Sequence, residues 1–308
     1  MRRRTLMAGA LVAGIFMVRA RLGFAQEESG SATPAARGEV TQTAMQSGYA
    51  PVNGLQLYYE SHGDGGVPLV VLHGAFMSTG MMMPLVSMLA ASRRVIAVDL
   101  QGHGRTADID RPLRFDQLAD DVAALIDYLG LDQADLYGYS KGGQVALRLA
   151  MRRAELVRKL VAVSAPFASD AVHPEVRAGI AALTPEMLAG TPFYEDYIRV
   201  APNPDDFPTL AAKMKALDME PFAWSPAEIR AIVAPTLVVI GDADIVPPEH
   251  AVELFELRGG GVPGDLVGLP AARLAVLPGT THVGVMARYE WLAPMVAEFL
   301  DVPLSEGQ

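Results

Sequence analysis

Short runs of valine, isoleucine and leucine recur along the chain from Gly48 onward, separated by amphipathic or polar segments. Apolar runs of this length, rich in β-branched residues, predict β-strands. The run at residues 68–74 has an uninterrupted apolar centre, which is typical of a strand buried on both faces of a sheet. The pattern predicts strands at residues 55–63, 68–74, 94–100, 134–140, 159–165, 235–244 and 271–279.

The segments between these strands follow a helical period. A helix predicted over residues 115–130 carries Leu118, Val122, Leu125, Ile126 and Leu129 on one face. A second amphipathic segment, residues 289–300, predicts a closing helix. Alternating strands and helices predict the α/β class, in which a mostly parallel sheet has helices on both faces.

The alternation stops between residues 167 and 233, where no good strand is found. Eight prolines divide this segment into short pieces of helical pattern. Its aromatic and methionine residues suit an apolar pocket, although most of them are expected to pack the segment onto the sheet. We therefore predict a helical insertion that covers one end of the sheet.

The N-terminal region has the pattern of an export signal. Residues 1–25 combine a basic start, an apolar run from Met7 to Val18, and small residues up to Ala25. The adjacent Arg3 and Arg4 resemble a twin-arginine signal. Cleavage would leave a polar linker at 26–47 and a domain at 48–303, exported to the periplasm or secreted. An uncleaved N-terminal anchor is the alternative, although the run is short for a membrane span.

Composition narrows the classes of function. The 308 residues are enough for one large α/β domain, and 51% of them are hydrophobic. The chain has no cysteine, which excludes disulfides, zinc–thiolate sites and a cysteine nucleophile. Cleavage after Ala25 would remove five arginines and no acid, moving the net charge from −10 to −15. Such an acidic domain is a poor binder of nucleic acid or anionic membrane.

One strand-to-helix junction carries a candidate nucleophile. The sequence from Gly138 to Gly142 reads Gly-Tyr-Ser-Lys-Gly and lies between a predicted strand and a predicted helix. A sharp turn there exposes the hydroxyl of Ser140 and points backbone N–H groups at the reacting carbonyl, and the glycines relieve crowding. Helix capping is the alternative role of Ser140.

A serine nucleophile needs a histidine as base, and His282 follows the last predicted strand. Because the carboxyl ends of parallel strands meet at one edge, Ser140 and His282 can come together there. His62 precedes a strand and belongs at the opposite end. His173 and His250 are predicted to be solvated.

The acid that orients the base is predicted at the carboxyl end of the segment at residues 235–244, where its apolar run stops. Asp244 follows the strand end and is favoured, whereas Asp242 is better placed to brace the turn and stays the alternative. The chain order is then serine, aspartate, histidine. The oxyanion would bind the backbone N–H groups of Lys141 and of Ala75, with Phe76 as alternative to Ala75.

Five segments in this order resemble the α/β-hydrolase superfamily, and they span most of residues 48–300. They read VVLHGAF, VIAVDLQGHGRT, LYGYSKGGQVAL, VVIGDADIVPPEH and LPGTTHVGV. The resemblance implies a mostly parallel eight-stranded sheet with a helical cap over about residues 167–233. It also implies structural roles for Asp99 and His103. Lys141 departs from the small or apolar residue common at its position, and we expect its side chain to reach solvent.

The same resemblance bears on the reaction. A serine at the elbow resembles the acyl-transfer branch, which predicts a serine hydrolase of carboxylic esters or lactones acting on a small, apolar, ester-like substrate. A C–C bond hydrolase, a cofactor-free perhydrolase, a peptidase and a non-catalytic binding protein remain alternatives. Motifs for phosphate loops, dinucleotides and zinc are missing from the sequence, so we expect no cofactor and no metal. The oligomeric state is left open.

Overall fold

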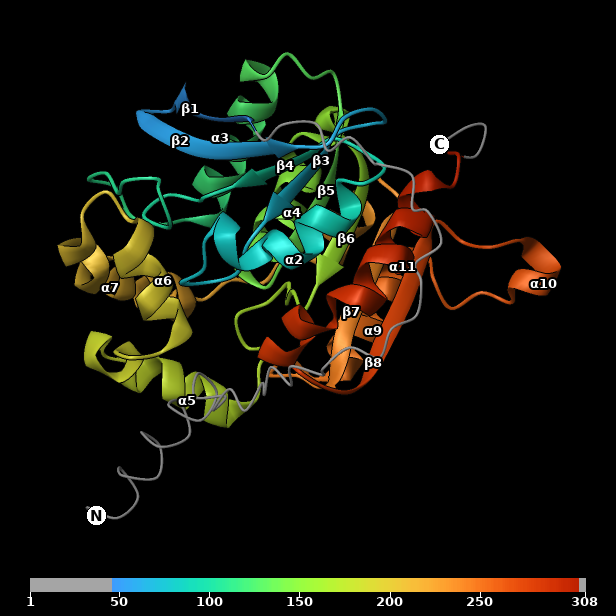
Figure 1. The fold of residues 1–308 in the computed structure, drawn as a ribbon. Coiled ribbons are helices and arrows are strands. Elements are labelled where there is room, and N and C mark those ends of the chain that lie inside the picture. Colours follow the sequence, from blue (N-terminus) through green and yellow to red (C-terminus); the bar gives the residue numbers. More distant parts are fainter. Residues whose placement is uncertain (1–45, 305–308) are drawn as a thin grey trace, which may run out of the picture.

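The computed structural model describes residues 46–304. Its strands form one eight-stranded sheet in the order β1-β2-β4-β3-β5-β6-β7-β8 (Figure 1). The strands are β1 (Gln46–Val52), β2 (Leu55–His62), β3 (Leu69–Leu72), β4 (Val95–Val98), β5 (Ala134–Tyr139), β6 (Val157–Val163), β7 (Thr236–Ala243) and β8 (Ala272–Thr281). All seven strands predicted from the apolar runs are present.

Strand direction places the functional edge of the sheet. β1 pairs with β2 and β2 pairs with β4 in antiparallel fashion, whereas every other pair of neighbouring strands, from β4–β3 to β7–β8, is parallel. The mostly parallel sheet is therefore confirmed. β1 is the strand that the apolar pattern did not single out, and it begins at Gln46, two residues before the expected start at Gly48.

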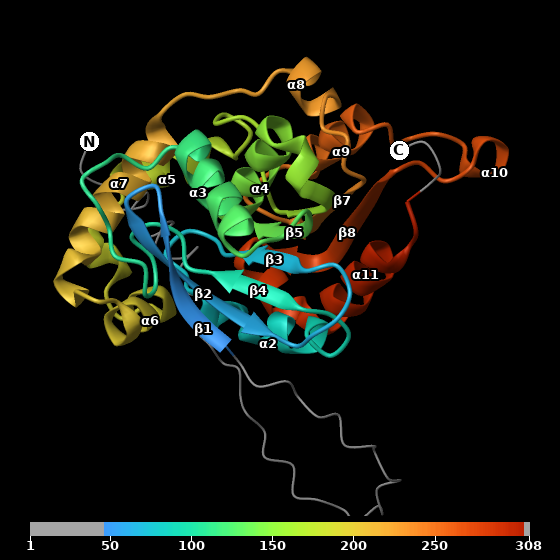
Figure 2. The ribbon, with the colours of Figure 1, turned by 90° about the horizontal axis from the view of Figure 1, so that it is seen from above.

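Helices cover both faces of the sheet, as predicted. Figure 2 shows α2 and α11 on one face and α3, α4 and α9 on the other. Their bounds are α2 (Thr79–Leu89), α3 (Phe115–Tyr128), α4 (Lys141–Arg152), α9 (Pro248–Leu257) and α11 (Tyr289–Asp301). The short α10 (Gly264–Val267) lies on an arm that projects before β8.

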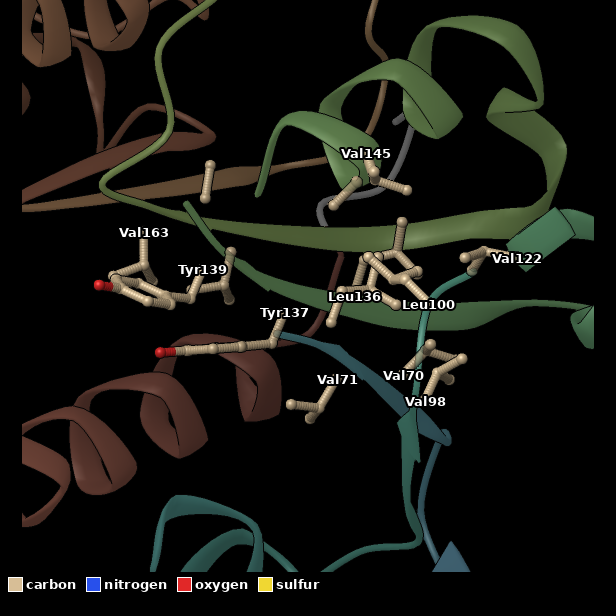
Figure 3. Packing of buried hydrophobic residues seen from close by; sticks show 14 of the residues in the cluster. Val70, Val71, Val98, Leu100, Val122, Leu136, Tyr137, Tyr139, Val145 and Val163 are labelled. Atoms are coloured by element: carbon tan, nitrogen blue, oxygen red, sulfur yellow. The ribbon is translucent and has the colours of Figure 1, made fainter. Parts of the chain in front are cut away.

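The central strands are buried on both sides. In β5, successive side chains point to opposite faces: Leu136 lies near Val145 of α4, and Tyr137 lies on the other side (Figure 3). Both side chains are fully buried, as are Val70 and Val98 of the adjacent strands. A core packed on both faces holds the carboxyl ends of the strands rigidly, and these ends carry the candidate site.

The chain between β6 and β7 forms short helices and no strand of the sheet. These are α5 (Pro174–Ala182), α6 (Pro192–Val200), α7 (Phe207–Met219) and α8 (Pro226–Arg230), with 3₁₀ turns at Pro185–Leu188 and Pro204–Asp206. α5, α6 and α7 lie together beyond one end of the sheet (Figure 1). Aromatic contacts attach them, including Phe207 with Phe76 at 6.1 Å and Phe222 with Phe115 at 5.0 Å between ring centroids.

The predicted export signal at residues 1–25 and nearly all of the linker at 26–47 lie outside the described residues. Between residues 46 and 304, we find no helix with the length and hydrophobicity needed to cross a membrane.

Candidate active site

Ser140 lies at the sharp turn between β5 and α4. Its φ of 53° and ψ of −115° are unfavourable for a residue with a Cβ atom. The turn brings strand and helix so close that a Cβ on Gly138 would lie 2.3 Å from the carbonyl oxygen of Gly142. A Cβ on Gly142 would lie 2.3 Å from the carbonyl oxygen of Leu72 in β3. The glycines flanking Ser140 are therefore required by close backbone approach.

Two hydrogen bonds connect Ser140 to the predicted base and acid. His282 Nε2 lies 3.0 Å from Ser140 Oγ, and His282 Nδ1 lies 2.7 Å from Asp244 Oδ1. When Nδ1–H donates to Asp244, Nε2 is left to accept the serine proton. The Tyr139 hydroxyl donates to the His282 carbonyl at 2.9 Å, which fixes the loop after β8.

Asp244 is buried, with 5% of its surface exposed. Its Oδ1 also accepts the Val246 N–H at 3.1 Å, and its Oδ2 accepts the Ser164 hydroxyl at 2.6 Å. Burial acts to raise the pKa of Asp244, but the adjacent His282 and these hydrogen bonds together hold that pKa below its usual value. The carboxylate therefore stays ionised at neutral pH and can stabilise a protonated His282.

Asp242, the alternative acid, has a different environment. It is exposed, and its carboxylate accepts the backbone N–H groups of Gly279 at 2.9 Å and Thr280 at 3.0 Å. These two hydrogen bonds hold the pKa of Asp242 below its usual value, and the bond from Thr280 has the larger effect. Asp242 thus braces the bend of β8 just before His282, while the structure brings Asp244 to the histidine ring.

The predicted oxyanion donors lie beside Ser140. Ala75 and Lys141 border the same cavity as Ser140, and Lys141 is the first residue of α4. N–H groups in the first turn of a helix have no acceptor within the helix and are available to an anion. Phe76, the alternative donor, has a φ of 61° in the same loop.

Two other histidines near this loop are part of the scaffold. His73 Nδ1 donates to the Gly74 carbonyl at 2.7 Å, while its Nε2 accepts the Leu100 N–H at 3.1 Å. Burial lowers the pKa of His73 to about 4 and that of His103 to about 3, so both rings stay neutral. The burial of His103 agrees with the structural role that the resemblance implies for it.

Comparison with known proteins places this geometry in a family. The model of the α/β hydrolase fold family matches residues 67–217. A pimeloyl-[acyl-carrier protein] methyl ester esterase of Neisseria meningitidis serogroup B is 30% identical over 253 residues, covering 75% of this chain and 92% of the esterase. The chain belongs to the α/β-hydrolase family.

Other relatives of this hydrolase differ in what they act on. The dihydrolipoyllysine-residue acetyltransferase component of the acetoin cleaving system of Pseudomonas putida is 30% identical over 265 residues, 79% of this chain, and the chain spans 66% of that protein. A meta-cleavage product hydrolase from Pseudomonas fluorescens, at 22% identity, has a TM-score of 0.66 and covers 83% of this chain and 97% of its own. This structural likeness shows the fold alone.

The side chain of Lys141 corrects a prediction. The side chain is mostly buried instead of extending into solvent: 17% of it is exposed, and its ammonium group pairs with Asp218 of α7 and donates to Gln144 Oε1 at 3.1 Å. A cation at a helix N-terminus is unfavourable by itself, and Asp218 offsets that effect. In this hydrolase the ion pair connects the helices inserted before β7 to the turn that holds Ser140.

A largely apolar cavity opens at Ser140 and His282. It has a volume of about 1120 Å³, including its opening to solvent. Its apolar walls include Met77, Phe193 and Phe222, together with Val176 and Ile180 on one face of α5. Arg177, Asp218, Gln144 and Ser169 supply the polar part of the lining.

Sequence reasoning did not identify these pocket residues individually. Val176 and Ile180 are four residues apart, a spacing that the core face of any helix shares. Among the aromatic and methionine residues of the segment 167–233, Phe193 and Phe222 border the cavity, whereas Phe207 and Met214 are buried in the core. No group of three His, Asp or Glu side chains suited to a metal ion is found within residues 46–304.

Proposed function

We propose that the protein is a serine hydrolase that cleaves carboxylic esters or lactones through an acyl-enzyme on Ser140. One observation carries the proposal. Ser140 borders an apolar cavity, and hydrogen bonds connect it through His282 to the buried Asp244. A nucleophile, its base and an orienting acid within hydrogen-bond distance are the requirements for acyl transfer.

The proposed reaction has two halves. His282 Nε2 takes the proton of Ser140 as Oγ attacks the carbonyl carbon of the substrate. The oxyanion that forms accepts hydrogen bonds from the backbone N–H groups of Ala75 and Lys141. Protonated His282 gives its proton to the leaving alcohol, and the acyl group stays on Oγ. Water, activated by the same imidazole, then releases the acid. Asp244 holds the ring and stabilises its positive charge in both halves.

A panel of substrates tests this function. We expect hydrolysis of p-nitrophenyl esters with short and medium acyl chains, because the cavity walls are mainly apolar. The panel includes a lactone, a vinylogous diketone for C–C cleavage, peroxyacid formation from acetate and peroxide, and a peptide anilide. A fluorophosphonate is expected to phosphonylate Ser140 with loss of fluoride, which adds the mass of the phosphonyl group to the peptide that contains Ser140.

The outcomes separate the alternatives. Labelling of Ser140 together with turnover of another panel member but not of esters would replace the ester assignment with that activity. A folded protein that is neither labelled nor active on any panel member would contradict the hydrolase mechanism and favour a non-catalytic binding protein.

We also propose that residues 1–25 form an export signal, that residues 26–47 are a linker and that residues 167–233 form a cap on a 48–303 hydrolase domain. The basic start, apolar run and small residues before Gln26 support export to the periplasm or medium. N-terminal sequencing of protein from the extracytoplasmic fraction should begin near Gln26. Full-length protein starting at Met1 in the soluble cytosol would refute export.

A further inference from the structure

Ser164, directly after β6, has an unusual backbone conformation. Among residues 46–304, the non-glycine residues with positive φ are Asn53, Phe76, Ser140 and Ser164. Phe76 lies in the loop that borders the cavity, and Ser140 is the proposed nucleophile, so three of the four lie at the candidate site. Backbone strain of this kind persists where surrounding structure holds it, and it gathers at functional sites.

The contacts of Ser164 place it between nucleophile and acid. Its backbone N–H donates to the Val239 carbonyl of β7 at 2.8 Å, and the carbonyl of the preceding residue, Val163, accepts the Ser140 N–H at 2.8 Å. Ser164 is 1% exposed. The end of β6 is therefore fixed to β7 and to the residue that follows β5, next to the strand ends that carry Asp244 and Ser140, and Ser164 itself has little freedom to move.

The hydroxyl of Ser164 binds the carboxylate of Asp244 on the side away from the base. Ser164 Oγ donates to Oδ2 at 2.6 Å, whereas Oδ1 accepts from His282 and from Val246. A carboxylate held at both oxygens cannot rotate about its Cβ–Cγ bond without breaking a hydrogen bond. Loss of the Ser164 donor would leave a buried charged oxygen short of a partner.

We propose that Ser164 is a positioning residue for catalysis, which fixes the carboxylate plane of Asp244 so that Oδ1 faces His282. The inference rests on the proposed function, because it assigns Asp244 the role of orienting acid. A φ of 51° favours glycine, which would adopt it without strain. The serine hydroxyl, bound to a buried carboxylate, is the feature that glycine lacks.

The test uses Ser164→Gly, which removes the hydroxyl and relieves the strain, and Ser164→Ala, which removes the hydroxyl and keeps the strain. Both variants should lower kcat for p-nitrophenyl butyrate about tenfold or more, with KM changed less than about twofold. Ser164→Gly should melt at a temperature no lower than that of Ser164→Ala, so that lost stability does not explain the lost rate.

A double-mutant cycle separates positioning from general structural damage. Its readout is the rate at which an activated phosphonate labels Ser140, which remains measurable in slow variants. If Ser164 acts through Asp244, adding Ser164→Gly to Asp244→Ala should change that rate less than about twofold. An equal loss in both backgrounds would overturn the proposal, as would a Ser164→Gly enzyme with kcat within twofold of wild type.

Asn53 provides a matched control. It has a φ of 48° and donates from Nδ2 to Asp121 Oδ1 at 3.0 Å, on the turn between β1 and β2, which β4 and β3 separate from β5 in the sheet. Asn53→Gly therefore makes the same kind of change and should leave kcat unaltered. Failure of the proposed function gives a different result: Ser140→Ala would still hydrolyse esters. If Ser140 is required and Ser164→Gly keeps full activity, the positioning role alone is wrong.

Discussion

The substitution Ser140→Ala is expected to lower kcat for p-nitrophenyl esters by at least about 10,000-fold and to leave the fold intact. The proposed nucleophile, base and acid act as a unit, so that loss of the nucleophile disables all three. The turn that holds Ser140 depends on Gly138 and Gly142, which the substitution leaves in place. Alanine has the same Cβ at the same φ, so the backbone gains no new strain. Steady-state hydrolysis and fluorophosphonate labelling measure the effect, and thermal melting checks the fold.

Ser87, exposed on α2, offers a matched control. Ser87→Ala removes a hydroxyl from a helix surface and should hydrolyse and label as the wild type does. Hydrolysis by a purified, unlabelled Ser140→Ala protein at the wild-type rate would mean that another group performs the reaction. Because His282 has its hydrogen-bond partners at 2.7 and 3.0 Å, such a result would also require a different role for that ring.

Local patterns were enough to predict seven of the eight strands, the sharp turn at Ser140 and the chain order of the proposed nucleophile, acid and base. Ser140, Asp244 and His282 each follow an apolar run, and parallel strands bring their carboxyl ends to one edge. Asp244 and Asp242 differ by two positions, so their distinct environments follow from where β7 ends. A strand boundary of this kind can be read from sequence because apolar burial stops there.

Contacts between distant segments were not predictable in this way. The partner of Lys141 is Asp218, which lies on a helix 77 positions further along the chain, and no periodic pattern connects the two. Ser164 reads as the polar end of a strand, and its bond to Asp244 depends on the packing of β6 beside β7. The apolar residues of α5 that border the pocket have the same spacing as residues that face a core. Whether they face a cavity therefore depends on how the inserted helices pack against the sheet.

Asp244→Asn should lower kcat by about 1,000- to 10,000-fold while the protein stays folded, by analogy with the same change in serine proteases. The asparagine amide would donate toward Nδ1 of His282, which favours the tautomer with its proton on Nε2. That nitrogen then cannot accept the Ser140 proton. The lost carboxylate charge also leaves the imidazolium unstabilised. The loss should appear in kcat and in the rate of phosphonate labelling.

Asp242→Asn is the matched comparison, because it makes the same chemical change two residues away. Each carboxylate oxygen of Asp242 accepts one backbone N–H at the bend of β8, and the NH2 group that replaces one of these oxygens in asparagine cannot accept. We expect a small loss of rate, from slight movement of the loop that carries His282, and a modest fall in melting temperature. The reverse ranking, with Asp242→Asn the slower enzyme, would mean that Asp242 and not Asp244 orients His282.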